Sequence, residues 1–187
     1  MARSSLVRSP LAVSPYEYRC DVSLRLKCFS GWRRSEIRKE GKYTSEPVEG
    51  LRSANEMLLI MGSAPLQMQK LYPTRVAAEG YVDKYLERAV ASTDANNMIY
   101  YINASRNYDP SANLKKITVP VMWINSADDF INPPELGIAQ KQVHEMPRAK
   151  FVLIPISDAT RGHGTHTLAA IWKDYLVELL AESEPKH

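Results

Sequence analysis

The stretch "ITVPVMWINSADDFINPPE", residues 117–135, decides the fold of this chain. Its first nine residues form a short apolar run rich in β-branched side chains, which is typical of a strand buried on both faces. The run ends in a turn that carries two adjacent carboxylates, Asp128 and Asp129. Carboxylates at the end of a buried strand are catalytic, structural or merely solvated, and the rest of the chain decides among these interpretations.

A second apolar run, "KFVLIP" at residues 150–155, follows a segment of helical periodicity at residues 133–146. A strand, a helix and a strand of these lengths predict a right-handed βαβ unit with parallel strands. The closing segment, residues 165–182, has an apolar face that we expect to cover the sheet. That face consists of Leu168, Ile171, Trp172, Tyr175, Leu176 and Leu179.

The region before residue 117 has mostly helical periodicity. We expect helices over residues 51–61, 74–90 and 93–105. Thr74 is placed to cap the second of these, and Thr93 or Asp94 the third. The sequence thus predicts helices first and a small α/β unit at the end.

Composition excludes several classes of function. The formal net charge is +3, and the basic residues near the start carry no interleaved aromatic side chains, which argues against nucleic-acid binding. Two cysteines, Cys20 and Cys28, form neither a disulfide framework nor a four-ligand zinc site. No apolar run is long enough to span a membrane, so we expect a cytoplasmic protein. The acid-free opening, residues 1–15, also has the composition of an organelle transit peptide.

A histidine gives the carboxylates a partner. The loop "ISDATRGHGTH", residues 156–166, places His163 after the second predicted strand. Reactive groups in open α/β sheets gather at the carboxyl ends of the strands, where we expect Asp and His to meet. An Asp after one strand and a His after the next form the back half of a Ser-Asp-His arrangement. In that arrangement the His takes the proton of the nucleophile and the carboxylate holds the imidazole tautomer.

The chain resembles the C-terminal half of the homoserine O-acetyltransferase-like branch of the α/β-hydrolase superfamily. The similarity begins at about residue 32 and rests on four stretches. These are "GLRSANEMLL", "DANNMIYYINASRNYDPS", "ITVPVMWINSADDFINPPE" and "GHGTH". The resemblance matches Asp129 and His163 to the catalytic acid and base, because Ile131 and Pro133 follow Asp129 at the family's spacing. Asp128 is then a neighbour that shapes the turn.

The resemblance implies a partial α/β-hydrolase fold, made of the last parallel strands and a helical lid. Residues 32–116 correspond to the lid-like region, and residues 117–187 to the C-terminal βαβα part. Residues 1–31 have no counterpart, and we expect a poorly ordered or aberrant leader there. The N-terminal half with the nucleophile elbow is absent from the predicted fold.

The implied chemistry lacks its nucleophile. The family carries a serine on a G-x-S-x-G elbow before the acid, and no such motif occurs in the 187 residues. Ser63 ends a helical segment, so we interpret it as a helix stop. We therefore expect acyl transfer or ester hydrolysis in the family, with only Asp and His retained here and this chain alone inactive. A non-catalytic truncated fragment or binding module is the alternative.

The resemblance also implies partners and cofactors. The expected substrate is a small acyl compound, with acetyl-CoA as acyl donor and no other cofactor; a homodimer is left open. Members that acetylate homoserine usually carry Asp directly after the catalytic His, where this chain has Gly164, which favours a hydrolase-like relative. His163 and His166 lack a carboxylate or cysteine at metal-ligand spacing, so no metal site is predicted.

Overall fold

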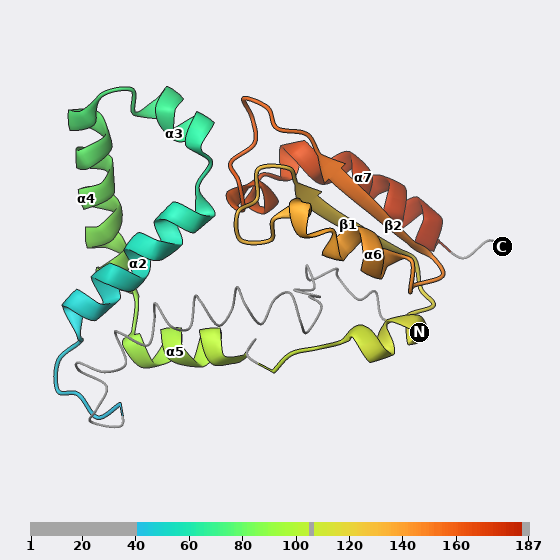
Figure 1. Ribbon diagram of the computed structural model, residues 1–187, viewed down its shortest axis with the longest axis horizontal. Helices are drawn as coiled ribbons and strands as arrows, with labels where there is room; N and C mark the ends of the chain where they lie inside the picture. The colour runs from blue at the N-terminus through green and yellow to red at the C-terminus, as the bar shows by residue number, and fades with distance from the viewer. Residues whose placement is uncertain (1–40, 105–106, 185–187) are drawn as a thin grey trace. The chain divides into compact units, whose positions relative to one another are not determined.

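The computed structural model describes residues 41–104 and 107–184 (Figure 1). The described residues form two compact units, one that ends at Tyr108 and one that begins at Asp109. Each unit has its own core. The predicted leader, residues 1–31, lies outside the described residues.

The first unit is helical. It consists of α2 (Val48–Gly62), α3 (Pro65–Leu71), α4 (Arg75–Ser92) and α5 (Ala95–Ala104). Its buried centre is formed by Leu51, Ala54, Ala95 and Met98. The three helices predicted from periodicity are confirmed as α2, α4 and α5. The sequence does not predict the short helix α3, because Ser63 indicates only a helix stop, whereas Pro65 begins the next helix at its first position.

Side chains cap the helices α4 and α5 as the sequence predicts. Thr74 Oγ1 accepts a hydrogen bond from the backbone N–H of Ala77 at 3.2 Å. Asp94 Oδ1 accepts one from the N–H of Asn97 at 2.8 Å, so Asp94 rather than Thr93 caps α5. Capping of this kind satisfies donors that have no partner inside the helix.

The second unit contains a parallel two-stranded sheet, made of β1 (Val121–Ser126) and β2 (Ala149–Ile154). Both predicted strands are confirmed, although β1 begins four residues later than expected. The delay follows from Pro120, which has no N–H to donate to a neighbouring strand. The 3₁₀ helix η2 (Ser111–Lys116) occupies the segment before it.

The connection between the strands is broken into two short helices. They are the 3₁₀ helix η3 (Pro134–Leu136) and α6 (Ile138–Val143). Gly137 separates them with a φ of 65°, a left-handed conformation that ends helices and that glycine adopts without strain. The prediction of one helix over residues 133–146 was therefore wrong.

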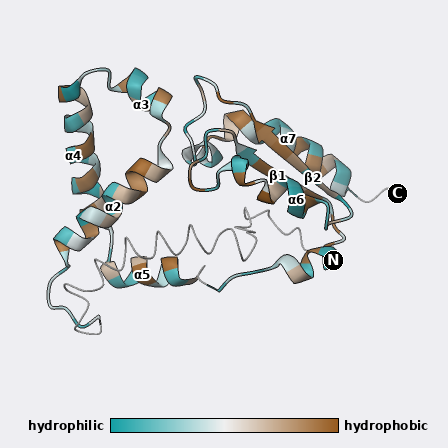
Figure 2. Cartoon of the chain, viewed as in Figure 1, coloured by the Kyte–Doolittle hydropathy of each residue, from teal (hydrophilic) through white to brown (hydrophobic). Residues whose placement is uncertain are grey.

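The last helix, α7 (Ala169–Ser183), packs against β1 as predicted. The core of this unit includes Leu114, Trp123, Val143 and Met146, all buried. Figure 2 shows that β1 and β2 are mainly hydrophobic, whereas α7 carries hydrophilic residues along its length. This hydrophobic core joins the two strands to η2 and α6. Among the described residues, no helix combines the length and the apolar character needed to cross a membrane.

Salt bridges at the surface join α7 to β2. Lys150 Nζ lies 2.9 Å from Glu178 Oε1 and 2.8 Å from Glu182 Oε1. All three side chains are about half exposed, so water and salt screen each pair and its contribution to stability is small.

Candidate active site

The parallel pairing brings the carboxyl ends of the two strands together. Ser126, the last residue of β1, lies opposite Ile154, the last residue of β2. One further hydrogen bond, from the N–H of Ala127 to the carbonyl of Ile154 at 2.8 Å, extends the pairing by one residue. The acid loop (residues 127–133) and the histidine loop (residues 155–163) therefore begin side by side.

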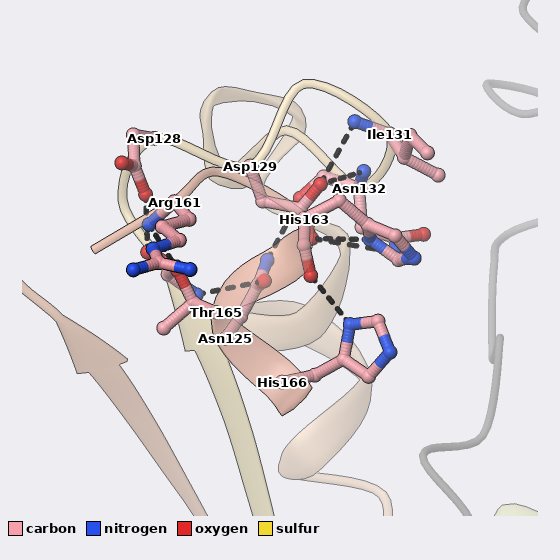
Figure 3. Close-up of polar contacts among 10 residues, drawn as sticks. Asn125, Asp128, Asp129, Ile131, Asn132, Arg161, His163, Thr165 and His166 are labelled. Atoms are coloured by element: carbon pink, nitrogen blue, oxygen red, sulfur yellow. Dashed lines mark hydrogen bonds and ion pairs between the residues drawn. The ribbon is translucent and has the colours of Figure 1, made fainter. Parts of the chain in front are cut away.

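The two loops bring the predicted acid and base into contact (Figure 3). Asp129 Oδ2 lies 3.0 Å from Nδ1 of His163, although the two residues are 34 positions apart in the sequence. The Asp129 side chain is only 5% exposed, whereas that of His163 is 32% exposed. The structure thus presents a buried carboxylate behind an imidazole that reaches the surface of this unit.

Backbone donors hold the second oxygen of Asp129. Its Oδ1 accepts hydrogen bonds from the N–H groups of Ile131 at 2.8 Å and Asn132 at 2.9 Å. Burial acts to raise the pKa of Asp129. The hydrogen bonds from His163, Asn132 and Ile131 and the charge of His163 outweigh that effect and hold the pKa below its ordinary value. Asp129 is therefore ionised near neutral pH.

Two asparagines that the sequence analysis did not single out support the acid loop. Asn125 Nδ2 donates to the carbonyl of Asn132 at 2.7 Å, and Asn125 Oδ1 accepts from the N–H of Ser126 at 2.8 Å. The amide of Asn132 lies 3.5 Å from Asp129 Oδ2 and 3.4 Å from His163 Nδ1. Asparagine near a strand end usually indicates only a turn, so the sequence held no clear signal for this role.

The shorter contact, with Asp129, selects one tautomer of His163. An ionised Asp129 can only accept, so Nδ1 carries the proton and donates it to Oδ2. Nε2 then keeps its lone pair, and no hydrogen bond among the described residues involves this atom. An imidazole held in this way can take a proton from a hydroxyl group placed next to Nε2.

The backbone around His163 is held by its own turn. Gly162 has a φ of 57°, in the left-handed region that favours glycine. The N–H of Arg161 donates to Thr165 Oγ1 at 2.8 Å, and η4 (Gly164–Thr167) follows directly. His163 therefore projects from a closed turn and not from an open loop.

The remaining histidine of this loop has a different environment. The exposed ring of His166 contacts the carbonyl of His163 through Nδ1, and its centroid lies 4.8 Å from that of the His163 ring. Within residues 41–104 and 107–184, no group of three or more His, Cys, Asp or Glu side chains is placed to hold a metal ion. His166 thus contacts the backbone of the turn, and among the described residues it has no hydrogen bond to Asp129.

Ser63 lies where the sequence predicts a helix stop. It follows the last residue of α2 in an extended conformation, and its Oγ donates to the carbonyl of Ile60 at 3.3 Å. This is ordinary chemistry for the end of a helix.

The lowered pKa of Asp129 predicts a pH-dependent contribution to stability. Because the pKa is depressed in the folded state, the stabilisation is fully present above the unfolded-state value of about 4 and is lost as pH falls through the folded value. Urea unfolding of the native chain and of Asp129→Asn at several pH values measures this. The difference in unfolding free energy between the two should shrink below about pH 4. A difference that stays constant down to about pH 2 would contradict the prediction.

Comparisons with known proteins identify solved structures with a similar fold. No protein-family model matches the chain, and no curated protein matches it in sequence. In structure it is similar to homoserine O-acetyltransferase from Bacillus anthracis, with a TM-score of 0.74 and 18% identity over 94% of this chain and 52% of that chain. It is also similar to esterase E22, with a TM-score of 0.69 and 14% identity over 90% of this chain and 52% of that chain.

A third similar structure is MGS-M2, an α/β hydrolase enzyme from a Medee basin deep-sea metagenome library. The TM-score is 0.55 at 19% identity, over 88% of this chain and 52% of that chain. The chain therefore spans about half the length of each of these solved structures. Identities this low show the fold alone. The fold predicted from the sequence is confirmed: this chain has the partial α/β-hydrolase fold of a C-terminal half, similar to that of homoserine O-acetyltransferase.

Proposed function

We propose that this chain supplies the acid and the base, Asp129 and His163, of an α/β-hydrolase site for acyl transfer or ester hydrolysis. The observation that carries the proposal is the 3.0 Å contact between Asp129 Oδ2 and His163 Nδ1 at the carboxyl ends of two parallel strands. Its order along the chain, acid before base, is that of the Ser-Asp-His arrangement in this fold.

The proposed chemistry runs through Nε2 of His163. This atom takes the proton of a serine hydroxyl while the serine oxygen attacks the carbonyl carbon of the acyl substrate. The imidazolium then gives its proton to the leaving group, and an acyl-serine forms. In the second half, Nε2 activates a hydroxyl acceptor or water, which releases the acyl group. Asp129 stabilises the imidazolium throughout.

The part that this sequence does not contain is a serine on a nucleophile elbow. No G-x-S-x-G motif occurs in the 187 residues, and a serine on such an elbow is needed to complete the site. A small acyl compound is the proposed substrate, with acetyl-CoA as one acyl donor. Gly164 stands directly after His163, which favours a hydrolase-like substrate over homoserine. A homodimer is part of the same proposal.

The second candidate is a non-catalytic role, as a fragment or a binding module without its own chemistry. The missing elbow favours it, because removing the nucleophile removes the acyl-enzyme route.

A direct test uses an activated ester. An imidazole held by a carboxylate can take a proton from water while the water attacks p-nitrophenyl acetate, and this reaction needs no serine. We expect hydrolysis by the native chain that His163→Ala abolishes. His144→Ala serves as the matched control, because His144 is exposed at the end of α6. A fluorophosphonate probe, added in parallel, reports any activated serine, and we expect no labelling.

The outcomes separate the two candidates. Hydrolysis that depends on His163 but not on His144 supports a working acid–base pair. A folded chain with no such hydrolysis would favour the non-catalytic role. Labelling by the probe that requires His163 would show that a serine of this chain is activated, and Ser63→Ala would be the next variant.

A further inference from the structure

Asp128, the neighbour of the candidate acid, joins the acid loop to the histidine loop. Its Oδ1 accepts a hydrogen bond from Ser126 Oγ at the end of β1. Its Oδ2 accepts one from Thr160 Oγ1 at 2.8 Å, across 32 positions of sequence. Thr160 is completely buried. Asp128 therefore joins the acid loop, to which it belongs, both to the end of β1 and to the histidine loop, whereas a simple turn residue would contact only its own turn.

Thr160 also closes the histidine loop on itself. Its Oγ1 accepts from the N–H of Ser157 at 3.1 Å and lies 3.0 Å from the carbonyl of the same residue. A hydroxyl group has one proton to donate, and an ionised carboxylate is a stronger acceptor than a carbonyl. The proton of Thr160 thus goes to Asp128, and the hydroxyl fixes the loop to the acid side.

The backbone between Thr160 and His163 has little conformational freedom. Arg161 donates its N–H to Thr165 Oγ1, Gly162 is held in a left-handed conformation, and His163 follows at once. A shift of Thr160 would therefore be passed on to His163. A separation between Nδ1 and Asp129 Oδ2 that grows from 3.0 Å toward 3.6 Å is no longer a hydrogen bond.

We propose that Asp128 and Thr160 are positioning residues that set the contact between Asp129 and His163. The two adjacent carboxylates then have separate tasks: Asp129 holds the imidazole, and Asp128 holds the loop that carries it. An effect of these residues on catalysis rests on the proposed function. Their effect on the contact between Asp129 and His163 does not.

The test reads the Nδ1–H proton of His163 by NMR in the full chain, labelled uniformly with ¹⁵N. Thr160→Val removes the hydroxyl, and Thr160→Ser keeps it. In Asp128→Asn, the amide nitrogen cannot accept, so one of the two hydroxyl contacts is lost. Asp109→Asn is the matched control, because Asp109 accepts from Ser111 Oγ at 2.6 Å in an exposed turn away from the strand ends.

We expect a protected Nδ1–H signal in the native chain, in Thr160→Ser and in Asp109→Asn. In Thr160→Val and Asp128→Asn this signal should be lost to solvent exchange while the amide signals of β1 stay in place. Retention of the signal in folded Asp128→Asn and Thr160→Val would overturn the proposal, as would its loss in Thr160→Ser. If Thr160→Val does not fold, Asp128→Asn and Thr160→Ser decide the question.

This readout requires neither a serine nor a substrate. A chain that keeps the Nδ1–H signal but hydrolyses no ester argues against the proposed function only. A chain that loses the signal in the control variant as well argues against the positioning role only.

Discussion

Asp129→Asn is expected to lower the His163-dependent hydrolysis of p-nitrophenyl acetate by about 10²–10⁴-fold, the contribution of a well-placed acid–base group. Asp129 Oδ1 accepts from two backbone N–H groups, so an asparagine would keep its carbonyl oxygen at that position. Its amide would then face His163 as a donor. Nδ1 would have to accept, and the proton would move to Nε2, which could no longer act as the base.

Asp109→Asn again serves as the control, since it makes the same chemical change in an exposed turn. Circular dichroism establishes that each variant is folded before its initial rates are compared. A folded Asp129→Asn chain that hydrolyses the ester as fast as the native chain would show that the carboxylate does not govern the imidazole.

Trp123→Ala should destabilise the second unit by about 3–5 kcal/mol, the usual cost of removing a large aromatic side chain from a core. Trp123 is 9% exposed and lies in the core cluster with Leu114, Val143 and Met146. Its ring meets that of Phe151 edge-on, with centroids 6.5 Å apart and an interplanar angle of 84°. This contact joins β1 to β2, so its loss removes hydrophobic burial and a favourable aromatic pair together.

Urea unfolding followed by circular dichroism measures the effect without relying on tryptophan fluorescence. Tyr101→Ala is the comparison, because that aromatic ring is 81% exposed and its loss should change the unfolding free energy by less than about 0.5 kcal/mol. Equal midpoints for native chain and Trp123→Ala would mean that the cluster does not stabilise the sheet. Domains of this size have a total stability of about 5–15 kcal/mol, so the change amounts to a large share of it.

Much of the fold could be predicted because its signals are local. The apolar runs that became β1 and β2 are short and bounded by turn residues, and Thr74 and Asp94 lie next to the helices that they cap. The order of Asp129 and His163 along the chain was also visible, because each follows its own strand. Patterns of this kind are contained in a few neighbouring residues.

The remaining features depend on residues that meet only in three dimensions. The contact of Asp128 with Thr160 gives no periodicity and no spacing that would reveal it. The Asn125 amide that supports Asn132 looks like any turn residue in the sequence. Gly137 shows a related limit: a glycine within a helical pattern is often tolerated, and only its φ of 65° shows that it divides the helix.

The parallel pairing of β1 and β2 has a consequence for how the chain folds in time. Parallel strands cannot be joined by a tight turn, so the whole connection through η3 and α6 must close before they pair. Closing it costs chain entropy before any long-range contact compensates, whereas α2, α4 and α7 form from neighbouring residues. Asp129 and His163 can therefore meet only after β1 has paired with β2. During refolding, the appearance of the Nδ1–H signal of His163 reports this pairing, and circular dichroism reports the earlier formation of the helices.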